Sequence, residues 1–236
     1  MSDPKETRRP EFLALNHRGK TPVFVDFLPQ PSTSEPAERV DPEVVTINES
    51  LAILHYIDMY HNPDRPLLPP ITSRRSRALV LARVQETENL RLAYDVLEDA
   101  HFDAENTGGK LNDADRARLI EAVDKELDYW EVYAAKTPFI AGVEFGLADC
   151  AFFPCLAYMV HRGFEWRRKR YNASGILEEV DAWPHLIAYF HRVWNRGGQD
   201  GCAQKAQPMG WKRKGKSNVW TGIKRNAKGR SEKKAF

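Results

Sequence analysis

The chain has 236 residues, 42% of them hydrophobic and 29% charged, a balance typical of globular proteins that excludes a predominantly disordered chain. Its formal net charge of +2 indicates no particular class of partner, and its three cysteines exclude a disulfide-stapled scaffold and a CxxC metal motif. No apolar run is long enough to span a bilayer and the N-terminus lacks the apolar stretch of a secretory signal, so we expect a cytoplasmic protein with no membrane partner.

The first part of the chain predicts a mixed α and β segment. Helical periodicity predicts helices at residues 11–16 and about 50–60. Apolar alternation predicts strands at residues 21–27 and 44–47. Residues 28–43 contain four prolines and many polar side chains, which favours an exposed excursion that is too long for a tight hairpin.

The junction between the second strand and the following helix holds three polar residues, Asn48, Glu49 and Ser50. Such residues at a helix start satisfy free backbone N–H groups and suit the positive end of the helix dipole. Helix capping is therefore the simplest role for them.

A proline-rich linker at residues 62–70 precedes a segment that we predict to be entirely helical. The expected helices span about 73–105, 112–136, 147–162 and 183–195, shorter helical pieces are expected near 174–180, and no strand is expected. The first two are amphipathic neighbours and should form an antiparallel pair, while 147–160 is apolar almost all round and should be the core helix. The predicted fold class is α+β, mainly α.

The C-terminal residues 201–236 carry eleven lysines and arginines against one acid, which leaves the rest of the chain with a net charge of −8. Basic residues interleaved with Trp211 and Trp220 can hold phosphates by charge and stack on bases, and such a run is also compatible with nuclear targeting. Charged termini are more often solvated, mobile extensions. We expect a mobile tail and keep nucleic-acid binding as the alternative.

Histidine and cysteine give no sign of a metal site or a nucleophile. The seven histidines show no ligand spacing with a carboxylate partner. Cys150 and Cys155 fall on the core helix, where a buried cysteine behaves as a small hydrophobe. We expect no metal cofactor.

Three motifs occur in an order that resembles the cytosolic glutathione transferase superfamily: "RRPEFLALNHRGKTPVFVD", then "INESLAILHYID", then "PFIAGVEFGLADCAFFPCLAY". In that family the first motif ends in Lys-Val-Pro, the second opens a helix with Glu-Ser, and the third is a Thr-x-x-Asp cap before a buried helix. The likeness covers residues 8–195.

The resemblance implies a thioredoxin-like, glutathione-binding domain at residues 1–66, here incomplete, and an all-helical domain at 72–200, followed by the basic tail 201–236. It further implies a cytoplasmic homodimer that conjugates its co-substrate glutathione to a small apolar electrophile, an activity used in detoxification. The electrophile and the class within the family are not specified by the sequence.

Glu49 and Ser50 match the family pair that holds the γ-glutamyl end of glutathione. A helix N-terminus offers free N–H groups to a carboxylate, Ser50 adds a hydroxyl, and Glu49 can accept from the ammonium group. Capping and ligand binding would use the same geometry.

Thr21 and Pro22 match the family's cis-proline position, which implies that the Thr21 backbone faces the cysteinyl part of glutathione; an ordinary proline at a strand start is the alternative. Lys20 and Arg8 match positions where cations of the family lie near the glycyl carboxylate of glutathione. The alternative is that they are surface charges with no role in binding. Tyr94 and Tyr158 could line the electrophile pocket or be core aromatics.

The sequence departs from the family in four places. Only ten residues precede the helix 11–16, too few for the strand–helix–strand unit that carries the thiol-activating Tyr, Ser or Cys, so no catalytic residue is assigned. His17 replaces the proline of an Asn-Pro pair, residues 28–43 form an insertion of unassigned role, and Gly146 replaces the capping Ser or Thr that would pair with Asp149. Two functions stay open: a glutathione transferase, and a non-catalytic binding or scaffold module of the kind found in translation elongation factors.

Overall fold

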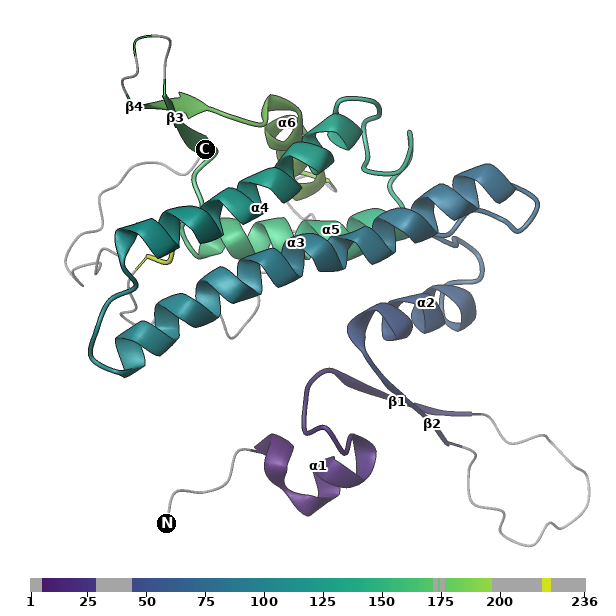
Figure 1. The fold of residues 1–236 in the computed structure, drawn as a ribbon. Coiled ribbons are helices and arrows are strands. Elements are labelled where there is room, and N and C mark those ends of the chain that lie inside the picture. The colour runs from purple at the N-terminus through teal and green to yellow at the C-terminus, as the bar shows by residue number, and fades with distance from the viewer. Residues whose placement is uncertain (1–5, 29–43, 172–173, 175–176, 197–217, 222–236) are drawn as a thin grey trace, which may run out of the picture. The chain divides into compact units, whose positions relative to one another are not determined.

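The computed structural model describes residues 6–28, 44–171, 174, 177–196 and 218–221. Clustering of neighbouring residues divides the chain into two compact units, Met1–Leu67 and Leu68–Phe236. We call them the N-terminal unit and the helical unit, and describe each by itself (Figure 1).

The N-terminal unit contains the two strands and the helices that the sequence predicts. Its elements are η1 (Glu6–Arg8), α1 (Pro10–Leu15), β1 (Val23–Phe27), β2 (Val44–Asn48) and α2 (Ser50–Tyr60). The strands pair antiparallel, with Val23 opposite Asn48 and Phe27 opposite Val44. Of the Pro-rich residues 28–43, expected to form an exposed excursion, residues 29–43 lie outside the described part of the chain.

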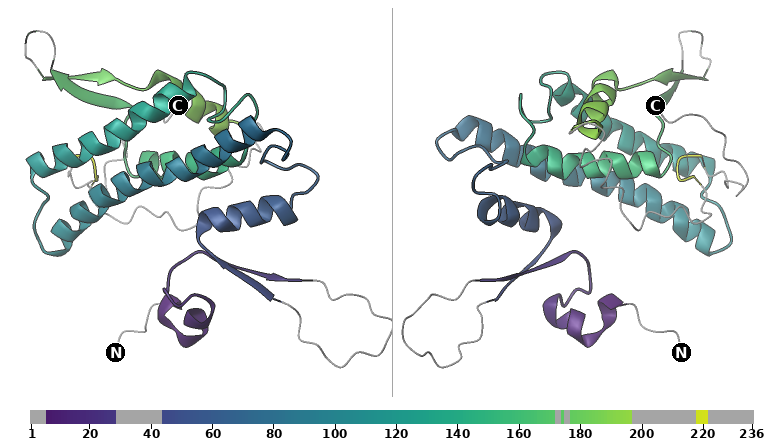
Figure 2. Two further views of the ribbon diagram at one scale, coloured as in Figure 1. Left: turned by 45° about the vertical axis from the view of Figure 1, so that its right-hand side comes forward. Right: turned by 180° about the vertical axis from the view of Figure 1, so that it is seen from behind.

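The helical unit is built on a pair of long helices. Its described residues form the helices α3 (Arg74–Asn106), α4 (Asp113–Ala134), α5 (Leu147–His161) and α6 (Pro184–Trp194), which agree with the predicted ranges. Helices α3 and α4 are antiparallel neighbours, and α5 lies along α3 in both views of Figure 2. The predicted fold class, α+β and mainly α, is confirmed.

The core of the helical unit lies where these helices meet. Trp130 of α4 stacks on Phe152 of α5 with ring centroids 3.9 Å apart, and both side chains are buried. Other large side chains that are fully buried come from all four of these helices: Leu90, Tyr94, Leu97, Leu127, Leu147, Leu156, Met159, Leu186 and Tyr189. Helix α5 is the core helix that its composition predicts.

Polar side chains define the starts of three helices. The Asn112 carboxamide accepts from Asp115 N at 2.8 Å and caps α4. At α5, Asp149 accepts from Gly146 N at 2.8 Å and Ile140 N at 3.0 Å, so the carboxylate half of the capping box is kept although Gly146 has no side chain to complete it. Glu131 of α4 caps α6 by accepting from His185 N and Leu186 N.

The expectation of helical pieces and no strand near 174–180 is wrong. Strands β3 (Arg167–Tyr171) and β4 (Leu177–Asp181) form an antiparallel hairpin in which Arg167 faces Asp181. The Arg167 guanidinium lies 3.7 Å from the Asp181 carboxylate and 3.8 Å from that of Glu179. These strands have no apolar face to reveal them by alternation, and opposite charges across the pair stabilise them instead.

Candidate functional site

The turn between β2 and α2 has an unusual backbone. Glu49 has φ 77° and ψ 119° and is followed by Ser50, the first residue of α2. A positive φ is rare for a residue with a side chain, and such outliers concentrate at binding sites. The turn therefore stands out from the rest of the N-terminal unit as a candidate site.

The side chains of this turn do not cap the helix. Helix α2 has no side-chain hydrogen bond at its N-cap, so the capping role expected for Asn48, Glu49 and Ser50 is wrong. The Glu49 side chain is 74% exposed, and its carboxylate lies 3.8 Å from the Arg18 guanidinium. The first-turn amides, which cannot bond within the helix, are left for solvent or a ligand because no side chain of the described residues caps them.

Asn16 fixes the loop that precedes β1. Its buried side chain donates to Lys20 O at 2.7 Å and accepts from Arg18 N at 3.1 Å. Gly19 in the same loop has φ 61°, and a Cβ there would lie 2.7 Å from the Arg8 guanidinium. One amide side chain therefore holds both ends of the loop. Asn16 belongs to the first motif, but sequence reasoning assigned it no role.

The loop and the turn meet at one end of the hairpin. The Thr21–Pro22 peptide bond is cis, as the resemblance implies. Since Val23 pairs with Asn48, the next residues outward on the two strands are Pro22 and Glu49. The structure thus brings Thr21 and Pro22 to the same end of the sheet as Glu49 and Ser50.

The two predicted cations differ in how they are held. Arg8 Nη1 donates to Arg18 O at 3.5 Å, which fastens η1 to the loop. Among the described residues, Lys20 is anchored through its backbone carbonyl alone, and its side chain is exposed. With Arg18 they place three cations on the loop and its neighbour η1.

A second polar cluster connects β1 to α2, and sequence reasoning missed it. Asp26 accepts from the Tyr56 hydroxyl at 2.9 Å and lies 2.9 Å from His61 Nε2. The Tyr56 hydrogen bond and the neighbouring His61 lower the pKa of Asp26, whereas burial and the carboxylate raise that of Tyr56. The cluster stabilises the packing of α2 on the sheet.

Tyr94 and Tyr158, the two candidates for an electrophile pocket, share one polar partner in the helical unit. Both hydroxyls donate to Glu98, at 3.1 and 3.0 Å, and Arg162 Nε donates to the same carboxylate at 2.7 Å. Both phenols have raised pKa values, and burial is the main cause. The pKa of Tyr158 is raised to about 12, and that of Tyr94 is raised further. Both phenols therefore stay protonated at neutral pH.

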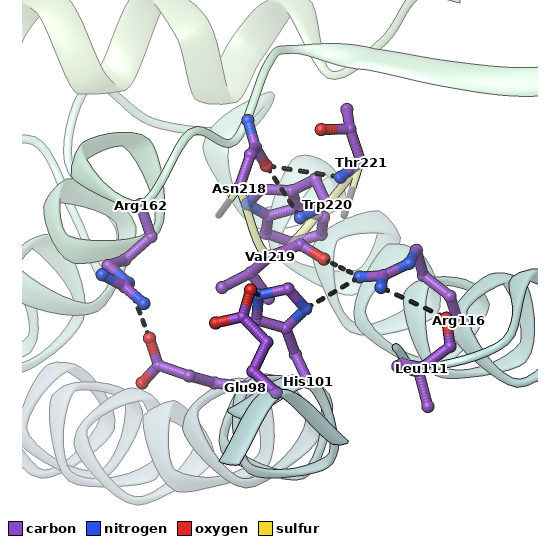
Figure 3. Close-up of polar contacts among 10 residues, drawn as sticks. Glu98, His101, Leu111, Arg116, Arg162, Asn218, Val219, Trp220 and Thr221 are labelled. Carbon is purple, nitrogen blue, oxygen red and sulfur yellow. Dashed lines mark hydrogen bonds and ion pairs between the residues drawn. The ribbon is translucent and has the colours of Figure 1, made fainter. Parts of the chain in front are cut away.

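One short stretch of the basic tail packs into the helical unit beside these residues (Figure 3). Val219 is fully buried, and its carbonyl accepts from the Arg116 guanidinium. The Trp220 ring stacks on Tyr94 with centroids 5.8 Å apart. Trp220 is therefore half-buried against Tyr94, which argues against the alternative use of this ring to stack on bases, while Trp211 lies outside the described residues.

Metal and thiol chemistry find no support among the residues that the structure describes. No group of three or more His, Cys, Asp or Glu side chains there has a metal-binding arrangement. Burial raises the pKa of Cys155 to about 12, so its thiolate form is negligible at neutral pH. In the same residues, no helix combines the length and hydropathy needed to cross a membrane.

Comparisons with known proteins connect the fold to one family. The model for the glutathione S-transferase C-terminal domain matches residues 113–192. Glutathione S-transferase A of Pleuronectes platessa is 26% identical over 81% of this chain and 71% of its own length. The crystal structure of a glutathione S-transferase from the clam Laternula elliptica is also 26% identical, with a TM-score of 0.58 over 81% of this chain and 72% of that one.

A third relative is similar in fold alone. The structure of a glutathione transferase homolog from Lodderomyces elongisporus, which holds two glutathione molecules per subunit, has a TM-score of 0.58 at 16% identity and covers 80% of this chain and 76% of its own. Together with the two-stranded sheet, these likenesses fit a truncated thioredoxin-like domain followed by a helical domain.

Proposed function

Because the chain belongs to the glutathione S-transferase superfamily, we propose that it binds glutathione through the N-terminal unit and conjugates it to an apolar electrophile held by the helical unit. We also propose that it acts as a cytoplasmic homodimer in detoxification, as members of the family do. Neither a metal nor a membrane is part of the proposal.

The observation that carries the proposal is the open turn at Glu49. A carboxylate at the start of α2 would accept from the uncapped first-turn amides and from the Ser50 hydroxyl, and the helix dipole would favour its charge. The exposed Glu49 carboxylate would accept from the ligand's ammonium group. The γ-glutamyl end of glutathione carries both of these groups on one carbon.

The rest of the tripeptide would extend along the loop before β1. The Thr21 backbone, which follows the segment held by Asn16, would pair with the cysteinyl amide. Lys20 and Arg8 would attract the glycyl carboxylate from the loop and from η1. Support for this orientation comes from the register, which sets Pro22 beside Glu49.

In the proposed reaction the glutathione thiolate forms a carbon–sulfur bond with the electrophile, whose leaving group departs with the electron pair, and the thiol proton passes to solvent. Binding would accelerate the reaction by orienting the two partners. No residue of this chain is assigned to thiol activation. The second candidate, a non-catalytic glutathione-binding module, is favoured by Tyr94 and Tyr158, whose hydroxyls are both engaged by Glu98.

Isothermal titration with glutathione tests the binding site. Ser50→Ala removes a hydroxyl from the proposed carboxylate site and should weaken binding about tenfold, the usual effect of losing one hydrogen bond to a charged group. Ser76→Ala, an exposed serine near the start of α3, is the matched control and should bind like the parent. Equal affinity of the parent and Ser50→Ala would exclude the proposed site.

Turnover of 1-chloro-2,4-dinitrobenzene distinguishes the two candidates. A transferase should release chloride and form the dinitrophenyl conjugate at a rate that Ser50→Ala lowers in parallel with binding. Glutathione binding without turnover would leave the non-catalytic module as the function.

A further inference from the structure

Three residues of the short turn Asn218–Thr221 contact the body of the helical unit: Asn218, Val219 and Trp220. Asn218 Oδ1 accepts from Trp220 N at 2.8 Å and Thr221 N at 3.3 Å, which folds the turn on itself. Asn218 Nδ2 donates to Gly163 O at 3.5 Å, just after α5. The turn is thus preformed locally and attached at one end.

Val219 provides the central anchor. Its side chain has no exposed surface, and its carbonyl accepts from Arg116, a buried arginine at the start of α4 (Figure 3). Arg116 also lies 3.3 Å from His101 Nδ1 and donates to Leu111 O at 3.4 Å. A buried guanidinium needs such acceptors, because an unpaired buried charge is strongly destabilising.

Trp220 covers the aromatic surface beside this anchor. Its ring stacks on Tyr94, with centroids 5.8 Å apart and planes at 30°, and meets Phe164 at 5.0 Å. Tyr94 is buried, and its hydroxyl bonds to Glu98. The ring of Trp220 therefore lies against Tyr94, one of the two tyrosines that the sequence offers as candidates for the electrophile pocket.

Docking of the Trp220 ring leaves one of its polar atoms without a hydrogen bond to the part of the chain that the structure describes. The Trp220 Nε1–H is buried and has no hydrogen-bond partner among the described residues. A buried donor without an acceptor makes the bound state less favourable than its area suggests. The basic tail and the acidic remainder of the chain attract each other, which favours attachment in a way that salt weakens.

From these contacts we propose that the helical unit has a receptor site for the Asn-Val-Trp-Thr segment of its own chain, and that the segment is a removable plug. When it is bound, Trp220 shields Tyr94; when it leaves, the face of Tyr94 and the Arg116 guanidinium become accessible to a ligand. The docking does not depend on the proposed function, whereas its effect on electrophile access rests on it.

Competition with a peptide tests the docking. A fluorescent peptide with the sequence of residues 216–223, KSNVWTGI, is titrated into the full-length parent and into full-length Trp220→Ala. The tethered segment of the parent competes at high effective concentration, so Trp220→Ala should bind the peptide about tenfold more tightly or better. The matched control Trp211→Ala, also in the basic tail, should behave like the parent.

Equal peptide affinity of the parent and Trp220→Ala would overturn the proposal, as would a peptide with its own tryptophan replaced by alanine that binds equally well. A competition strength that varies with protein concentration would show that the segment comes from a second copy, and would overturn the intramolecular plug. None of these measurements needs glutathione, so they stand whether or not glutathione binds.

A milder variant covers the case in which Trp220→Ala does not fold. Asn218→Ala removes the turn's internal bonds without changing a core side chain, and should raise peptide affinity by a smaller factor. Hydrogen exchange at Trp220 N should be slow in the parent and fast in Asn218→Ala, which lacks its acceptor. Fast exchange at Trp220 N in the parent would overturn the docking.

Discussion

The two units reach a defined structure by different means. Among the described residues of the N-terminal unit, Ile53 is the only buried apolar side chain, and the other buried side chains are Asn16 and Asp58. The described helices α3, α4, α5 and α6 of the helical unit each bury large apolar side chains, Trp130 and Phe152 among them. Polar anchors fix the first unit, and apolar burial fixes the second.

This difference indicates a division of labour. A unit held by polar anchors keeps many backbone groups and charges at its surface, where a polar ligand can reach them. Asp58, for example, accepts from Leu67 N at 2.6 Å and holds the chain after α2, while the start of the same helix stays open. Changes in the N-terminal unit should therefore affect binding most, and changes in the helical unit should affect stability most.

The largest expected effect comes from truncating the same residue type in each unit. Phe152→Ala removes a fully buried ring that stacks on Trp130, and should lower the free energy of unfolding by about 3–5 kcal/mol. Phe27→Ala is the matched change in β1, where the ring is 67% exposed, and should cost under about 0.5 kcal/mol. Urea denaturation followed by circular dichroism measures both. Similar losses in the two variants would remove the distinction between the units.

Asp149 is an exception to this difference between the units, because it is a polar anchor inside the helical unit. Asp149→Ala leaves Ile140 N and Gly146 N without their acceptor, which should cost about 2–3 kcal/mol for two buried donors. Asp113→Ala, an exposed acid in the first turn of α4, should cost only a few tenths, about 0.3 kcal/mol. The same urea titration compares them, and equal costs would mean that the Asp149 bonds contribute nothing specific.

Asn16→Ala tests whether an anchor of the N-terminal unit serves binding more than stability. Losing its bonds to Lys20 O and Arg18 N should cost about 1 kcal/mol of stability. Under the proposed function the loosened loop should also weaken glutathione binding about tenfold. His17→Ala, the exposed neighbour, is the control. Unchanged affinity in Asn16→Ala would separate the loop from the proposed site.

Most of the fold could be predicted from the sequence because periodicity is strong where helices bury a stripe. The hairpin β3–β4 could not be predicted, because most residues of its strands are charged and they show no alternation of apolar and polar side chains. Periodicity also left the orientation of α3 undecided: Leu92 and Val96 fit an apolar stripe but are 53% and 55% exposed, whereas Thr87 and His101 are buried. Which stripe faces the core depends on α4 and α5, which a local pattern does not contain.

The candidate site was predictable only in its residue types. The motifs name Glu49, Ser50, Thr21 and Pro22, but a positive φ at a glutamate has no signature in the sequence. Asn16 and the Trp220 contacts depend on loop and tail positions that only tertiary packing fixes. The basic residues around Trp220 suggest a nucleic-acid-binding element, whereas the structure shows its ring stacked on Tyr94.

Two aspartates, one in each unit, have pKa values that move in opposite directions. In the N-terminal unit, the Tyr56 hydrogen bond and His61 lower the pKa of Asp26 below 3.8. In the helical unit, burial raises the pKa of Asp124 from 3.8 to about 6 despite Arg168, whose Nε lies 3.3 Å from it. Titration of the carboxyl carbons followed by NMR should give Asp26 a pKa below 3.8 and Asp124 a pKa above 3.8.

The opposite shifts require opposite pH dependences. The folded protein binds fewer protons at Asp26 than the unfolded chain, so the stability from Asp26 is present above pH 3.8 and is lost as pH falls through its folded pKa. At Asp124 the folded protein binds more protons, so stability should increase by about 1–2 kcal/mol as pH falls from 6 towards 3.8. Asp124→Asn should remove that gain and leave the acid loss, and Asp26→Asn should do the reverse. If Asp124 titrates at 3.8, burial carries no cost for this carboxylate, and the contrast between the units would not extend to their charges.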